Sequence, residues 1–137
     1  MKTARHSDEL AWVMALSLAY CLASFIHFFH NAEYLGQYPN MPAWISRAGV
    51  YAAWLAITGV GAIGLLVVRS RFAPAGLVLI AAYAALGFDG LAHYGLAPMS
   101  AHSLAMNLTI WLEVAAAAAL LAAALRCLYR EGLRFGT

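Results

Sequence analysis

Charged residues are scarce in this sequence of 137 residues, where they make up 10% of the chain. About a quarter of the residues are charged in an ordinary soluble domain, so this composition excludes such a domain. The formal net charge is only +2, which gives no basis for binding nucleic acid. The 64% of hydrophobic residues instead indicate a chain that is surrounded by a lipid bilayer.

Cysteine is also nearly absent. The two cysteines, Cys21 and Cys127, lie far apart along the chain, and neither belongs to a CxxC pair. We therefore expect no disulfide framework and no thiol redox motif. Long polar stretches are missing as well, so the sequence leaves no room for a second, soluble domain between its apolar segments.

The apolar residues fall into four segments, each long enough for a membrane-spanning helix of roughly 20 residues. We predict helices at about residues 9–31, 43–68, 72–93 and 103–128. The predicted fold class is all-α: one transmembrane domain, residues 1–137, folded as an up-down-up-down four-helix bundle. Small residues in the second segment, Gly61 and Gly64 among them, would let neighbouring helices approach closely.

Basic residues occur in three groups that this topology brings to one side of the membrane: Lys2 and Arg5; Arg69 and Arg71; and Arg126, Arg130 and Arg134. Cytoplasmic loops carry the excess of Lys and Arg. We therefore predict a multi-pass protein of the inner cell membrane with both termini in the cytoplasm. The connections near Tyr38 and Ala97 would then face outward.

Four of the five histidines lie near the outward ends of the predicted helices: His27, His30, His93 and His102. Asp89 precedes His93 by four residues, so a continuous helix would place both side chains on one face. This arrangement predicts a polar cluster near the outward face of the bundle.

Imidazole and carboxylate groups from several helices can converge on one metal ion. We therefore predict a metal site near the outward, periplasmic face, either redox-active or catalytic. Methionines on this side favour copper over zinc or iron, and haem b held by two histidines is an alternative. The predicted ligands are His27, His30, Asp89, His93 and His102, with Asn31, Glu33, Met106 and Asn107 in support.

Glu113 lies near the middle of the fourth predicted helix. An ionisable side chain at this depth costs roughly 2.5–3.5 kcal/mol on insertion scales, so Glu113 and Asp89 are candidate catalytic residues. We expect the Glu113 carboxyl to be protonated or bonded to a partner such as Tyr20, Tyr83 or Thr58.

Two further functions fit the same residues. One is a cofactor-free membrane enzyme of isomerase or cyclase type, in which Asp89, Glu113 and His27 or His30 act as acid and base on a lipophilic small molecule. The other is a proton- or metal-handling subunit or assembly factor of a larger membrane complex, or a homo-oligomer. The sequence leaves open which of these applies, and whether the protein is an enzyme.

Overall fold

The computed structural model describes the backbone of residues 2–135 and the side chains of residues 8–132. The side chains of Lys2, Arg5 and Arg134, which contribute to the predicted orientation, lie outside the described residues. In chain order the elements are α1 (Lys2–Glu33), the short 3₁₀ helix η1 (Leu35–Gln37), α2 (Arg47–Val68), α3 (Ala73–Leu86), the 3₁₀ helix η2 (Asp89–Ala92), α4 (His93–Leu96), the 3₁₀ helix η3 (Met99–Ala101) and α5 (Leu104–Phe135).

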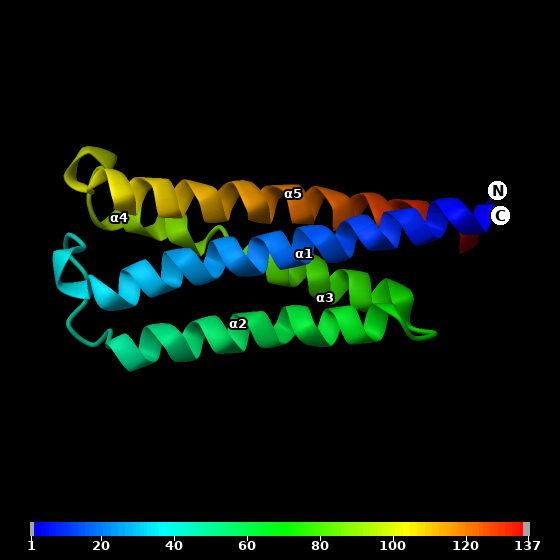
Figure 1. Ribbon diagram of the computed structural model, residues 1–137, viewed down its shortest axis with the longest axis horizontal. Helices are drawn as coiled ribbons and strands as arrows, with labels where there is room; N and C mark the ends of the chain where they lie inside the picture. The colour runs from blue at the N-terminus through cyan, green and yellow to red at the C-terminus, as the bar shows by residue number, and fades with distance from the viewer. Residues whose placement is uncertain (1, 136–137) are drawn as a thin grey trace.

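Four stretches of helix are long and apolar enough to cross a membrane: Asp8–Glu33, Arg47–Val68, Ala73–Leu96 and Leu104–Gly132. They confirm the four predicted apolar helices and point to a multi-pass membrane protein in a lipid bilayer. Figure 1 shows both chain ends at one end of the bundle, whereas the connections after α1 and before α5 lie at the other.

The helices pack in a ring, in which α1 contacts α2 and α5, and α3 contacts the same two helices. A large apolar cluster, with Val13, Ile80 and Leu120 among its buried members, fills the half of the bundle nearer the chain ends. A smaller cluster around Phe28 and Val50 joins α1 to α2 in the other half. Among the described residues, the buried polar side chains gather away from the chain ends, except for Ser17, whose hydroxyl donates to Val13 O at 2.8 Å.

Glycines set the close contact between α2 and α3. A Cβ atom on Gly61 would lie 2.6 Å from the Tyr83 ring, and one on Gly64 would lie 2.9 Å from Ile80 Cγ1. A Cβ on Gly76 would overlap the backbone of Val68. The predicted close approach of small residues is therefore confirmed for Gly61 and Gly64.

Three of the helices begin or end several residues away from the predicted positions. The first helix extends from Lys2 to Glu33, and the last continues to Phe135, because a helix can run on into polar sequence beyond the apolar segment. An ion pair between Glu9 and Arg130 joins these two extensions. The second helix begins only at Arg47, where the Ser46 side chain caps it by accepting a hydrogen bond from Gly49 N at 3.1 Å.

The predicted continuous third helix is wrong, since α3 ends at Leu86 in the middle of the span. From Gly87 onward the backbone N–H groups bond to the carbonyl three residues earlier, as in Gly87 N to Ala84 O at 3.0 Å. A Cβ on Gly87 would lie 2.7 Å from the Tyr20 hydroxyl, so glycine permits this close approach. Asp89 therefore begins η2 and His93 begins α4, and the two residues do not share one helical face.

Candidate functional site

A cavity of about 460 Å³ lies between α1, the first turns of α2 and the interrupted third span. Pockets for small molecules are typically about 300–1,000 Å³, so this volume suits a small ligand. Its lining divides into an apolar part and a polar part. The apolar part is Phe28, Met41, Pro42, Trp44, Ile45, Gly49, Val50, Ala53, Gly90, Ala92 and Leu96, and the polar part is His27, Asn31, Ser46, Asp89 and His93.

The cavity opens beside the N-terminal end of α2. Trp44, Ser46, Gly49 and Ala53 line the cavity and are also exposed on the surface of the molecule. Trp44, which is 83% exposed, stands at this opening. Because α2 begins here, the opening lies at one end of a helix that is long and apolar enough to span a membrane.

Asn31 and His93 form the best-defined polar contact of the site. Asn31 Nδ2 donates to His93 Nε2 at 3.0 Å, and both side chains are buried. Since an amide nitrogen only donates, the neutral His93 ring carries its hydrogen on Nδ1. Asn31 Oδ1 and His93 Nδ1 have no hydrogen-bond partner among the described residues. One acceptor and one donor are therefore left for a ligand.

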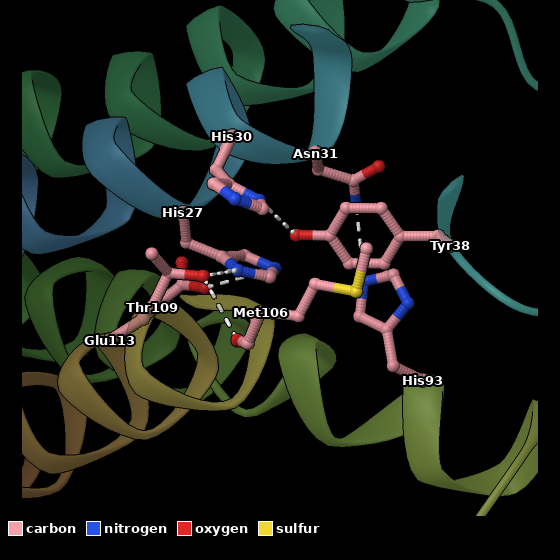
Figure 2. A network of polar contacts seen from close by, with 8 residues as sticks. All are labelled: His27, His30, Asn31, Tyr38, His93, Met106, Thr109 and Glu113. Carbon is pink, nitrogen blue, oxygen red and sulfur yellow. Dashed lines mark hydrogen bonds and ion pairs between the residues drawn. The ribbon is translucent and has the colours of Figure 1, made fainter. Parts of the chain in front are cut away.

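Tyr38 connects the histidines, and reasoning from the sequence alone missed it. Its hydroxyl shares a hydrogen bond of 2.9 Å with His30 Nδ1, and its ring centroid lies 4.8 Å from that of His93 (Figure 2). Only 4% of Tyr38 is exposed, and burial raises the pKa of its phenol to about 12. An aromatic residue within a polar loop is the one sequence feature that could have identified it.

His27 faces a buried carboxyl group. Its Nε2 lies 3.7 Å from Glu113 Oε2, and its Nδ1 lies 3.4 Å from the Thr109 hydroxyl, as Figure 2 shows. Glu113 is 1% exposed and His27 is 2% exposed. A Cβ on Gly90 would lie 3.4 Å from Glu113 Oε2 and 3.6 Å from His27 Nε2, so η2 passes directly over this pair.

The expected partners of Glu113 are wrong. The hydroxyl groups of Tyr20, Tyr83 and Thr58 are buried and have no hydrogen-bond partner among the described residues. These hydroxyls come from α1, α2 and α3, and none of them reaches the Glu113 carboxyl. The polar group found near Glu113 Oε2 is instead His27 Nε2, at 3.7 Å.

The predicted ligands come together only in part. His27, Asp89 and His93 line one cavity, and the ring centroids of His27 and His93 are 5.5 Å apart. His102 lies on the other side of His93, with ring centroids 6.2 Å apart, and its Nδ1 bonds to Pro98 O at 3.1 Å. His30 reaches the group through Tyr38.

The supporting residues have separate roles. Glu33 is bound by Arg47 at 2.7 Å and by the Tyr51 hydroxyl at 2.6 Å, away from the lining of the cavity. Asn107 donates to Met99 O and His102 O and accepts from the Tyr94 hydroxyl, so it holds the connection before α5. Met106 is buried, and its sulfur accepts a hydrogen bond from Ser103 N at 3.4 Å.

Among the residues that the structure describes, no group of three or more His, Cys, Asp or Glu side chains is arranged to hold a metal ion. The predicted five-ligand site is therefore without support, because His30 and His102 are separated from the cavity by Tyr38 and His93. Among the described histidines, the ring centroids of His27 and His93 are 5.5 Å apart and those of His93 and His102 are 6.2 Å apart.

In comparisons with known proteins, no protein-family model, no curated protein and no solved structure matches the chain.

Proposed function

We propose that this chain is a membrane enzyme that binds a small lipophilic molecule in the cavity and moves a proton from one atom of it to another. One observation carries the proposal: a single cavity is lined by Asp89 and His27, and the buried Glu113 carboxyl lies directly behind His27. Acid and base groups on two elements can therefore act on one bound molecule.

Asp89 is the base in this proposal. It lines the cavity at an exposed position, and no hydrogen bond to its carboxylate is found among the described residues. A carboxylate accepts a proton and has no other partner here to compete for it. Asp89 would remove a proton from a carbon atom beside a double bond or carbonyl group of the bound molecule.

His27 and Glu113 return a proton. His27 Nε2 and Glu113 Oε2 lie 3.7 Å apart, which is longer than a hydrogen bond, so a proton would pass between them only after the two side chains move closer. The Thr109 hydroxyl lies 3.4 Å from the other ring nitrogen. His27 would deliver this proton to a second carbon atom as the double bond shifts. One C–H bond breaks and another forms, so the product is an isomer and no co-reactant is consumed.

Heavy water provides the test. Protein in lipid nanodiscs is incubated in heavy water with lipids extracted from the membranes in which the chain occurs naturally, and mass spectrometry follows deuterium incorporation. We expect one lipophilic compound to gain deuterium with the wild-type protein. Asp89→Asn and Glu113→Gln should slow this gain at least 100-fold, because general acid–base groups contribute about 10²–10⁴-fold.

Glu33→Gln is the matched control. Glu33 is a carboxylate in the same half of the bundle, but it is paired with Arg47 and does not line the cavity. Its variant should exchange deuterium at the wild-type rate. The proposal is wrong if no compound gains deuterium, or if Glu33→Gln is as slow as Asp89→Asn.

A transition metal held by His93 and His102 is a second candidate. His93 Nδ1 and His102 Nε2 have no hydrogen-bond partner among the described residues, and both side chains are buried. A metal at His93 Nδ1 would require the other tautomer, in which the Asn31 amide turns so that its Oδ1 accepts from Nε2–H. Catalytic zinc sites use three protein ligands, and this pair has only two, so the candidate ranks below proton transfer. Stoichiometric copper, zinc or iron in purified protein that is lost in His93→Ala would favour it, and a Soret band would favour haem.

A further inference from the structure

The charges around the cavity restrict what can enter it. Among the described residues that line it, Asp89 is the only carboxylate and none is Lys or Arg. Arg47 follows Ser46 in the sequence, but its guanidinium is paired with Glu33 at 2.7 Å. A buried anion without a cationic partner is strongly disfavoured. A carboxylate or phosphate head group would therefore meet Asp89 with nothing to neutralise it.

The unpaired polar atoms restrict the ligand further. Asn31 is more than nine-tenths buried, lines the cavity, and its Oδ1 lacks a partner among the described residues. Together with the Asp89 carboxylate it offers acceptors to a donor group on the ligand. His93 also lines the cavity, and its Nδ1–H is a donor without a partner among the described residues. An alcohol matches this set, because its hydroxyl group both donates and accepts.

The apolar part of the cavity lining, which includes Phe28, Ile45 and Val50, fits a hydrocarbon tail. Ala53 also lines the cavity and is exposed on α2, so the cavity is open there. We propose, resting on the proposed function above, that the cavity takes a lipophilic alcohol and binds its hydroxyl group between Asp89, Asn31 and His93. The alcohol is preferred over an ether of the same length and over the corresponding carboxylate.

Three ligands with one tail test this selectivity: octanol, methyl octyl ether and octanoate. Each is titrated into the full chain in detergent micelles, and native mass spectrometry counts the molecules that stay bound. Two variants distinguish binding in the cavity from partition of the ligand into the micelle. Ala53→Trp places a bulky side chain in the cavity lining, whereas Ala52→Trp places one at an exposed position of the same helix outside the lining. Binding is assigned to the cavity only if Ala53→Trp abolishes it and Ala52→Trp retains it.

We expect octanol to bind about tenfold more tightly than the ether, because one hydrogen bond to a charged group is lost, and octanoate to bind more weakly still. Asp89→Asn keeps an acceptor oxygen but removes the charge, so octanol binding should persist while the exclusion of octanoate relaxes. Asn31→Leu should reduce the preference of octanol over the ether.

The outcomes separate the two proposals. If the three ligands bind equally in the cavity, the alcohol preference is wrong and the proposed proton transfer stands. If octanoate binds best, the electrostatic exclusion by Asp89 is wrong. If no ligand binds in a manner that depends on Ala53, the cavity is not a ligand site, and both proposals fall.

Discussion

At the scale of single residues, Tyr38 shows how a loop residue can complete a site built on helices. It lies in the connection after α1, and its ring packs between those of His30 and His93. With 4% of its surface exposed, it is more deeply buried than either histidine. Burial of a phenol favours its neutral form, which is the form that can donate to a histidine nitrogen. The histidine cluster therefore depends on this tyrosine staying protonated.

This dependence predicts an alkaline loss of stability. The pKa of Tyr38 is about 12 in the folded protein against 10.0 for the unperturbed side chain, so its contribution is complete below pH 10 and disappears as the pH rises through 12. The loss amounts to about 2–3 kcal/mol. Reversible unfolding in mixed micelles across this range measures it in the wild type.

Tyr38→Phe is the control for the same titration. The variant is less stable at every pH by about 1 kcal/mol, the usual net contribution of one hydrogen bond. The loss of stability between pH 10 and 12 that is due to ionisation of Tyr38 should be absent from this variant. If the free energies of unfolding of wild type and variant fall in parallel between pH 10 and 12, Tyr38 is not the group responsible for the loss.

At the scale of elements, the glycines on α2 and α3 differ in what surrounds them. Gly76 lies against the Val68 backbone, whereas nothing lies within 4 Å of a Cβ placed on Gly59. Both glycines are in helix interiors, so the intrinsic preference for alanine is the same at each. Only the packing between α2 and α3 distinguishes them.

Gly76→Ala should therefore lower the free energy of unfolding by about 1–3 kcal/mol, because the overlap is with backbone, which has little freedom to move. Gly59→Ala should raise it by about 0.5–1 kcal/mol through reduced backbone entropy. Unfolding in mixed micelles measures both variants. Equal stability of the two would show that α2 and α3 do not pack as closely as described.

The four spanning helices could be predicted because hydropathy averages over about 20 residues. The break at Gly87 could not, since it depends on the contact with Tyr20 from another helix. For the site, position near the outward helix ends was enough to place His27, Asp89 and His93 in one predicted cluster, but it also included His30 and His102, which do not line the cavity. It said nothing of Tyr38, which lies in a loop, or of the wall that α2 contributes.

At the scale of the whole molecule, the two ends of the bundle differ in charge. The connection between α2 and α3 carries Arg69 and Arg71, and the end of α5 carries Arg126 and Arg130. The cavity and the histidines lie in the half away from the chain ends. The positive-inside rule then predicts that the cavity opens near the outer face.

Cysteine labelling tests this orientation. In a background of Cys21→Ala and Cys127→Ala, exposed positions on the two connections are changed singly to Ser70→Cys and Gln37→Cys. A membrane-impermeant maleimide applied to intact cells should label Gln37→Cys and leave Ser70→Cys unlabelled until the cells are opened. The reverse pattern would place the cavity on the cytoplasmic side. The predicted homo-oligomer or larger complex stays a prediction.

The apolar cluster that fills the half of the bundle nearer the chain ends has an electrical consequence. Val13, Leu77, Ile80, Leu120 and Ala124 close that half, and the buried polar groups described for the cavity stop short of it. Under the proposed function, protons that enter the cavity would leave by the same face. The protein would then exchange protons with its ligand while the membrane stays insulating, and turnover would carry no current.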